Sequence, residues 1–472
     1  HRMGVAELAR LVSTRQVSPT ELVGYFLSRI DRLDPRLNAF TTVATEQALA
    51  AACTLTDEIA HGHYRGPLHG IPIGIKDLTD TAGIRTTYGS RLHADHVPSS
   101  DAEPVARLRA AGAVILGKTA THEFAFGTTT NNPHFGPTRN PWLLDHVPGG
   151  SSGGSGAAVA AGLVPLATGT DTGGSIRIPA AACGCVGFKP THGRVSLRGT
   201  YPLAASLDHL GPLARSTADC AIALQVLAGF DAADPWSRRL PDEDFTSAVG
   251  LPLQGLRLGI DHQHRPIPVS KNVCAAIERA LAAASALGAE IVEVSLPDPT
   301  QITIAASVIL LAESFAQHRD QFTARRTDYG ADVRDQLDAG AAIDAGSLVA
   351  ALHARERLTR DVERLFDTGV DAILLPTMAI TAPAIAAGIV DVDDVALPVA
   401  PAMASFTLLA DLTRMPAIAV PTGLAPDGLP TSVQIIGPIA HEALVLRIGH
   451  ALEGTLWPAW ERSPSGIDGD DS

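Results

Sequence analysis

The stretch of sequence that decides the fold runs from Pro148 to Arg177 and reads PGGSSGGSGAAVAAGLVPLATGTDTGGSIR. It holds nine glycines and four serines, which is too many for one simple turn. Glycine at this density indicates a backbone that takes positive φ angles or closely approaches another group. A phosphate-binding P-loop does not fit, because that motif requires a lysine after its last glycine. The run from Gly150 to Gly154 matches the nucleophile-elbow pattern GxSxG formally, but the match is weak because no predicted strand leads into it.

A third interpretation concerns the run Thr172-Gly173-Gly174-Ser175 at the end of this stretch. A turn of this composition can present successive backbone N–H groups beside an exposed hydroxyl. Such amides stabilise a developing oxyanion, which is worth ~3 to 4 kcal/mol per donor in acyl-transfer enzymes. On this interpretation Ser175 is the nucleophile.

A serine nucleophile needs a base, and the candidate is Lys76 in the run GIPIGIKD at residues 70–77. Period-two alternation places Ile71, Ile73 and Ile75 on one face of a strand and Lys76 on the other, in a stretch apolar enough to be buried. Desolvation lowers the pKa of a buried lysine from ~10.4 by up to several units, so a neutral Lys76 can accept a proton. The alternative, equally supported by spacing, is that Lys76 forms a salt bridge with Asp77 or another acid at the strand end.

The rest of the chain alternates helical stretches with short apolar runs. Ser18-Pro19-Thr20-Glu21 combines a capping residue, a proline at the first helical position and a glutamate three after the cap, which predicts a surface helix. This alternation predicts an α/β fold with a mixed, mostly parallel, twisted sheet that helices cover on both faces. The runs that predict buried strands are 113–116, 256–260, 291–294, 372–375, 417–420 and 433–436.

Composition narrows the classes of function. The formal charge of −14 would repel a nucleic-acid backbone, so nucleic acid is not an expected partner. No stretch offers the ~18 consecutive apolar residues of a membrane span. Five cysteines, an odd number with no CxxC pair, favour a reducing, cytoplasmic location. Seventeen histidines include no HExxH motif, and no metal site is predicted.

Several motifs together resemble the amidase signature family of serine hydrolases. They are GIPIGIKD, PGGSSGG and GTDTGGSIR, followed by GFKPTHGRVS and SLDHLGPLARS. The C-terminal half adds DAILLPT at 371–377, FTLLADLTRMPAIAVPTG at 406–423 and GLPTSVQIIG at 428–437. The resemblance covers the chain from about Ala6 to His450, and its fixed order of motifs is far more specific than any one of them.

The resemblance implies a catalytic triad in which Ser175 is acylated, Ser151 bridges and Lys76 is the terminal base. It also implies a cis peptide bond between Gly150 and Ser151. A relay follows, in which Lys76 accepts a proton from Ser151 while Ser151 accepts one from Ser175. No metal or organic cofactor is implied.

The same resemblance assigns the oxyanion hole to the backbone amides of Thr172, Gly173, Gly174 and Ser175. Asp171 and Arg177 correspond to residues that brace this loop. The segment Phe126, Gly127 and Thr128 is expected to wall the substrate pocket. Asp208-His209 is expected to be structural rather than part of a Ser-His-Asp system.

The domain organisation implied is a single amidase signature domain over residues 1–462, with a core at about 60–220 and 365–450. Residues 301–366 have a helical and charged composition. They predict either a solvated helical layer or a segment that covers the substrate. Residues 463–472 predict a flexible tail.

The function implied is hydrolysis of amide C–N bonds, with a small-molecule amide or carbamate as the substrate and a monomer or homodimer as the assembly. Two alternatives share the triad: a carbamate, urethane or ester hydrolase, and the glutaminase-like component of a tRNA-dependent amidotransferase. The C-terminal motif departs from the common family pattern at Asp411, Arg414 and Ser432. These departures affect the expected substrate preference or partner docking more than the chemistry.

Overall fold

The fold is taken from a computed structural model, which describes residues 1–464 and 467. Within these residues eleven strands form one mixed sheet. They are β1 (Phe40–Val43), β2 (Pro72–Lys76), β3 (Val114–Thr119), β6 (Leu166–Asp171), β7 (Val186–Lys189), β8 (His209–Ala214), β9 (Arg257–Ile260), β10 (Glu290–Glu293), β11 (Ala372–Pro376), β14 (Ala417–Leu424) and β15 (Pro430–Ile436). Their order across the sheet is β1-β3-β2-β6-β8-β7-β14-β15-β11-β9-β10. Each of the six strands predicted from apolar runs overlaps one of these.

The predicted predominance of parallel pairs is wrong, although the mixed sheet itself is confirmed. Only the pairs β2–β3, β2–β6, β9–β10 and β9–β11 are parallel, and the other neighbouring pairs in the sheet are antiparallel. The β14–β15 pair shows why, because five residues connect these strands and a parallel crossover needs a dozen or more. The prediction relied on continuous apolar runs, which indicate burial on both faces but not strand direction.

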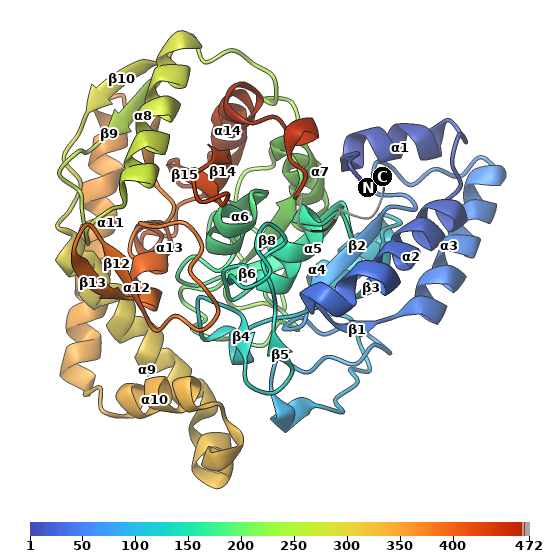
Figure 1. Cartoon of the computed structure of the whole chain (residues 1–472), viewed down its shortest axis with the longest axis horizontal. Helices are drawn as coiled ribbons and strands as arrows, with labels where there is room; N and C mark the ends of the chain where they lie inside the picture. Colours follow the sequence, from blue (N-terminus) through green and yellow to red (C-terminus); the bar gives the residue numbers. More distant parts are fainter. Residues whose placement is uncertain (465–466, 468–472) are drawn as a thin grey trace.

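Helices cover both faces of this sheet. Every residue of β2, β3, β6, β7, β8 and β15 is buried, and side chains of a strand alternate between the two faces. Figure 1 shows α1 to α3 at one end of the sheet and α8 to α11 at the other. The helices are α1 (Val5–Ser13), α2 (Pro19–Leu37), α3 (Thr45–Ala60), α4 (Glu103–Ala110), α5 (Gly153–Ala160), α6 (Arg177–Cys183), α7 (Thr217–Leu227), α8 (Lys271–Ala286), α9 (Pro299–Arg325), α10 (Ala331–Ala341), α11 (Ala345–Asp367), α12 (Val399–Ala404), α13 (Leu408–Leu412) and α14 (Glu442–Leu456).

The helix predicted from the capping pattern is confirmed as α2. The Ser18 side chain accepts a hydrogen bond from the Glu21 amide, and the Glu21 carboxylate accepts one from the Ser18 amide. Proline at the first helical position adds no unsatisfied donor there. Small two-stranded sheets lie outside the main one, formed by β4 (Asn131–Asn132) with β5 (Gly136–Pro137) and by β12 (Ile389–Val392) with β13 (Val395–Pro398).

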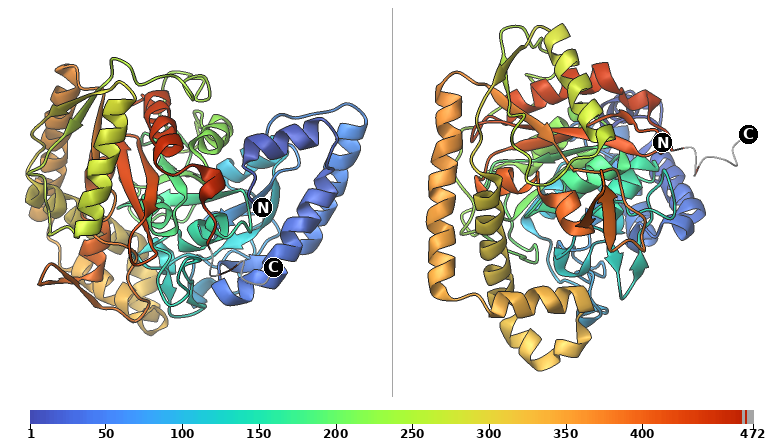
Figure 2. Two further views of the ribbon diagram at one scale, coloured as in Figure 1. Left: turned by 45° about the horizontal axis from the view of Figure 1, so that its top comes forward. Right: turned by 60° about the vertical axis from the view of Figure 1, so that its left-hand side comes forward.

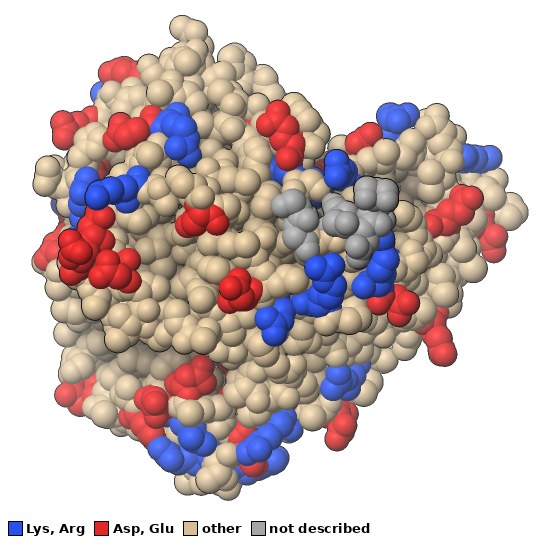
Figure 3. All heavy atoms as spheres, viewed as in Figure 1, with Lys and Arg blue, Asp and Glu red and all other residues tan. Residues whose placement is uncertain are grey.

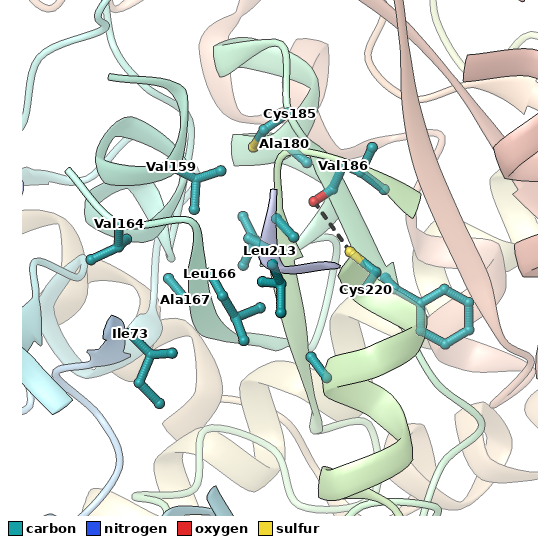
Figure 4. Close-up of a cluster of buried hydrophobic side chains, with 14 of the residues drawn as sticks. Ile73, Val159, Val164, Leu166, Ala167, Ala180, Cys185, Val186, Leu213 and Cys220 are labelled. Carbon is teal, nitrogen blue, oxygen red and sulfur yellow. Dashed lines mark hydrogen bonds between the residues drawn. The ribbon is translucent and has the colours of Figure 1, made fainter. Parts of the chain in front are cut away.

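The largest hydrophobic core packs small and β-branched side chains between the central strands and their helices (Figure 4). Ile73 of β2, Leu166 of β6 and Leu213 of β8 lie on the strands, facing Val159 of α5. The Cys220 thiol of α7 lies 3.8 Å from the Val186 carbonyl oxygen. All five cysteines are free, and Cys183 and Cys185 are buried, as expected for small core residues.

Residues 301–366 are helical, as predicted, and fall within α9, α10 and α11. Figure 2 shows α9 and α11 side by side at one edge of the molecule, with α10 across their ends. The helical stretch Pro299–Asp328 is long and apolar enough to cross a membrane by length and composition, with a hydropathy of 1.3 in its most apolar window. It packs against α10, α11 and α13, and one such helix is weak evidence for a membrane span.

Charged side chains are scattered on the face shown in Figure 3, with acidic and basic groups interspersed. This distribution agrees with the acidic net charge and with the absence of a basic cluster in the sequence. The predicted tail, 463–472, falls largely outside the described residues.

Candidate active site

Lys76 is the last residue of β2 and its side chain is fully buried. Its Nζ donates a hydrogen bond to Ser151 Oγ at 2.7 Å and another to Thr170 Oγ1 at 2.6 Å. The Lys76 amide donates to Thr168 Oγ1 at 3.1 Å, so two threonines of β6 hold the lysine. Neighbouring parallel strands therefore deliver the amine to the hydroxyl of the predicted bridging serine.

Burial lowers the pKa of Lys76 from 10.5 to about 7, and the carboxylates of Asp171 and Asp208 oppose this shift only in part. The alternative interpretation of Lys76 as the salt-bridge partner of Asp77 is not supported. The Asp77 carboxylate instead accepts hydrogen bonds from the amide and the hydroxyl of Thr87. A substantial fraction of Lys76 is therefore neutral near pH 7 and can act as a base.

The peptide bond between Gly150 and Ser151 is cis, as the resemblance implies. The Ser151 carbonyl oxygen accepts hydrogen bonds from the His122 amide at 3.1 Å and from the Thr121 hydroxyl at 3.0 Å. Gly150 has no room for a side chain, because a Cβ there would lie 2.6 Å from the Thr129 amide nitrogen. The glycine-rich composition of the loop thus follows from its close packing against residues 128–130.

Ser175 lies between β6 and α6 and is 8% exposed. Its carbonyl oxygen accepts a hydrogen bond from the Ser152 amide at 3.3 Å, which places the nucleophile loop beside the Ser151 loop. Within the described residues no hydrogen bond joins the Ser175 hydroxyl to the Ser151 hydroxyl. The first half of the predicted relay, from Ser151 to Lys76, is therefore present, and the second half is a step that catalysis must form.

The loop at 172–175 has the amides expected of an oxyanion hole, with one correction. The Gly174 amide donates to Asp171 Oδ1 at 2.7 Å, so it is committed within the loop and does not point to a substrate oxygen. The amides of Thr172, Gly173 and Ser175 donate no hydrogen bond to any group in the described part of the chain. These three amides are the oxyanion donors that the structure offers.

Two carboxylates brace this loop. Asp171 also accepts from the Ile176 amide at 3.1 Å and from Arg177 Nη2 at 3.0 Å. Burial alone would raise the pKa of Asp171, but the Arg177 charge and its hydrogen bonds outweigh burial and the pKa falls to about 2. Asp208 accepts a hydrogen bond from the Thr172 hydroxyl at 2.6 Å.

His209 does not pair with Asp208, which agrees with the prediction that the two residues are structural. His209 Nδ1 lies 3.1 Å from the Asp171 carbonyl oxygen, and its Nε2 lies 3.1 Å from Lys189 Nζ. Among residues 1–464 and 467 no group of three or more His, Cys, Asp or Glu side chains is arranged to hold a metal ion.

The segment expected to wall the substrate pocket lies beside the Ser151 loop. Phe126 is buried, and Gly127 and Thr128 are partly exposed. The Phe126 carbonyl oxygen accepts a hydrogen bond from Gln336 Nε2 at 2.9 Å, which ties the segment to α10. A Cβ on Gly150 would lie 2.7 Å from the Thr128 carbonyl carbon. Contact of these residues with substrate stays a prediction.

A cavity of about 540 Å³ opens on the other side of the triad. Thr170 and Thr172 line its inner end, and Tyr201 and Trp236 contribute aromatic surface. Glu313, Ala316 and Gln317 of α9 also line it, so the helical segment forms part of a cavity wall rather than a purely solvated layer. The residues 126–128 do not line this cavity.

Thr170 is the residue of the site that the sequence interpretation missed. It belongs to the same quoted stretch, and its signal is the spacing Thr168-x-Thr170 in the strand that pairs with β2. Two hydroxyls on one face of a buried strand need hydrogen-bond partners, and the end of the neighbouring strand carries the only buried cation of GIPIGIKD.

Comparison with known proteins agrees with this geometry. A family model described as "Amidase" matches residues 21–446. The A-type component of the glutamyl-tRNA(Gln) amidotransferase of Methylococcus capsulatus is 40% identical, covering 99% of this chain and 99% of the relative. A solved chain described as part of a vestigial protein complex that reveals the origins of an s-triazine catabolic enzyme is 36% identical, with a TM-score of 0.92 over 96% of this chain and 98% of that one.

A bacterial aryl acylamidase of the amidase signature enzymes is 31% identical, with a TM-score of 0.91 over 99% of both chains. The match to the family model spans the residues that carry the lysine, the cis serine and the glycine-rich nucleophile loop. The chain therefore belongs to the amidase signature family.

Proposed function

We propose that this protein cleaves amide C–N bonds through an acyl-enzyme on Ser175. The observation that carries the proposal is the buried amine of Lys76, which donates to Ser151 Oγ at 2.7 Å and has a pKa of about 7. A buried neutral amine next to a hydroxyl is the arrangement that activates a serine in the absence of histidine.

In acylation, Lys76 Nζ accepts the proton of Ser151 Oγ, and Ser151 Oγ accepts the proton of Ser175 Oγ. The Ser175 oxygen attacks the carbonyl carbon, and the π electrons of the carbonyl move to its oxygen. The amides of Thr172, Gly173 and Ser175 stabilise that negative charge, at ~3 to 4 kcal/mol for a well-placed donor.

Collapse of the tetrahedral intermediate breaks the C–N bond and restores the carbonyl. The leaving nitrogen takes the proton of Ser151, and Ser151 regains one from the Lys76 ammonium. Water then attacks the Ser175 ester, loses its proton along the same route, and Ser175 leaves as a hydroxyl. Lys76 ends the cycle neutral.

The test is hydrolysis of a panel of primary amides, anilides and carbamates, with release of the amine as the readout. Acylation on Ser175 predicts turnover of at least one amide or anilide and none by Ser175→Ala. Carbamates are an arm of the panel because the same acylation operates on their carbonyl. Turnover retained in Ser175→Ala would contradict the proposal.

A second candidate is the ammonia-supplying component of a tRNA-dependent amidotransferase. The observation that favours it is the 40% identity to the A-type component of glutamyl-tRNA(Gln) amidotransferase over 99% of both chains. Such a component would use the same triad on glutamine and would require a protein partner. Hydrolysis of glutamine together with copurification of a second protein from the source cells would favour this candidate. Turnover of anilides by the isolated chain, without glutaminase activity, would favour a free-standing amidase.

A further inference from the structure

The back of the oxyanion loop is held by the segment Thr407–Leu412, which includes α13. The Thr407 hydroxyl donates to the Gly173 carbonyl oxygen at 2.6 Å. Gly174 has a φ of +122°, and a Cβ there would overlap Thr407 Oγ1. The segment is 234 residues away in sequence, yet it packs directly against the peptide units that carry the oxyanion donors.

A second link from the same segment runs through Arg177. The Arg177 side chain is fully buried and its Nη2 donates to Asp171 at 3.0 Å and to Asp411 Oδ2 at 2.8 Å. Its Nη1 donates to Gln434 Oε1 at 2.8 Å, and the Gln434 amide is in turn fixed by the carbonyl oxygen of Phe406 at 2.7 Å. Asp411 thus holds one side of the arginine that holds Asp171.

The charges around Asp411 are all buried. Asp171 and Arg177 face it directly, His209 Nδ1 lies 3.6 Å from Asp411 Oδ1, and Lys189 lies beyond His209. Burial, with the nearby Asp171 carboxylate, raises the pKa of Asp411 well above its usual range. Its Oδ1 has no hydrogen-bond partner in the described part of the chain, so its clear structural contact is the one that Oδ2 makes with Arg177.

We infer that Asp411 is a positioning residue for the oxyanion hole, acting through Arg177 and Asp171 on the peptide units of residues 172–175. Asp171 is the residue that receives the Gly174 amide and so turns the loop such that the amides of Thr172, Gly173 and Ser175 face outward. Without Asp411, Arg177 loses one of two carboxylate partners and the loop loses part of its brace. The inference rests on the proposed function, because it concerns the donors of the acylation step.

The test compares Asp411→Leu with Asp411→Asn, which keeps an oxygen that can accept from Arg177. The first readout is the second-order rate constant for labelling Ser175 with a fluorophosphonate probe, which needs no knowledge of the substrate. We expect labelling to fall about tenfold or more in Asp411→Leu and to stay within about threefold of wild type in Asp411→Asn. Asp411→Ser is made in parallel as a smaller polar variant in case the leucine variant does not fold.

Asp219→Asn is the matched control. Asp219 is another fully buried carboxylate, but it accepts from the Ala6 amide at 3.1 Å in a part of the fold that does not touch the oxyanion loop. A general loss of stability would appear in both aspartate variants as a lower Tm, whereas slower labelling is expected only when Asp411 loses its acceptor. Labelling at the wild-type rate in folded Asp411→Leu and Asp411→Ser overturns the inference, as does an equal fall in Asp219→Asn.

A second readout separates this inference from the proposed function. Hydrogen exchange of peptides covering residues 171–178 is expected to be at least several-fold faster in Asp411→Leu than in wild type or Asp219→Asn. Failure of the wild type to label would count against the proposed function, while faster exchange would still support the positioning role. Unchanged exchange in Asp411→Leu overturns the positioning role whatever the labelling shows.

Discussion

Lys76 Nζ donates a hydrogen bond to Ser151 Oγ across 2.7 Å, in a place where neither residue has any exposed surface. Because water is excluded, the amine has only the hydroxyls of Ser151 and Thr170 to replace its hydration. Two neutral hydroxyls compensate a charged ammonium poorly, which is why burial brings the pKa of Lys76 to about 7. The same contact that makes the lysine neutral also aims it at the proton it has to take.

Removal of this amine tests its role as the base. We expect Lys76→Ala to lower kcat by about 10²- to 10⁴-fold with the fold retained, as for a general base. Lys118→Met is the matched control, since Lys118 is also fully buried and donates to Thr81 Oγ1 at 2.8 Å. The control is expected to lose about 1 to 3 kcal/mol of stability from unsatisfied acceptors and to keep kcat within about threefold. Equal losses of kcat in the two variants would contradict the assignment.

The pH dependence of the reaction follows from the direction of the Lys76 pKa shift. The neutral amine is the active form, so kcat/KM should rise with pH, level off above about 7 and fall about tenfold per unit below that value. A pH–rate profile between pH 5 and 10, on a substrate without ionisable groups, gives the measurement. A profile that keeps rising to pH 10 would show that the base is an ordinary, solvated lysine.

Thr170 orients the amine from the side opposite to Ser151. Thr170→Val keeps the shape of the side chain but removes the acceptor at 2.6 Å, and we expect kcat to fall about tenfold. Thr170→Ser retains the hydroxyl and should restore most of the activity. Steady-state kinetics of both variants decide the point, because a loss that serine does not restore would mean that packing of the methyl group matters instead.

The oxyanion loop should not tolerate a side chain at Gly174. With a φ of +122° and Thr407 Oγ1 in the space of a Cβ, Gly174→Ala is expected to cost about 1 to 3 kcal/mol of stability and to slow Ser175 labelling. Gly24→Ala is the control, because Gly24 lies within α2 and has no atom near its Cβ position. Thermal unfolding should show the control unchanged or up to about 1 kcal/mol more stable. Equal stability of the two variants would mean that the loop adapts.

Much of the site could be predicted because its residues lie in motifs that are local in sequence. Lys76 could be placed from the alternation of three isoleucines before it, and Ser151 and Ser175 from the glycines that their close-packed loops require. The cis bond before Ser151 followed from the family resemblance and is present.

The remaining features depend on contacts between distant segments. Asp411 reaches Arg177 across 234 residues of chain, and nothing in its own surroundings of Leu409, Ala410 and Leu412 indicates which cation it faces. The direction of the sheet strands was mispredicted for a similar reason, because burial patterns do not record which strand lies alongside. The free or committed state of the Gly174 amide depends on the turn geometry, which composition alone does not fix.

The most direct measurement of the central claim is the pKa of Lys76 in the folded protein. The chain has only four lysines, of which Lys76, Lys118 and Lys189 are fully buried and Lys271 is exposed. Protein labelled with ¹³C at the lysine ε-carbons therefore gives a four-signal NMR spectrum, in which Lys76→Arg assigns the Lys76 signal and Lys271 serves as the internal reference. The account predicts that the Lys76 signal titrates with a pKa of about 7, whereas a Lys76 amine that stays protonated above about pH 9 would contradict it.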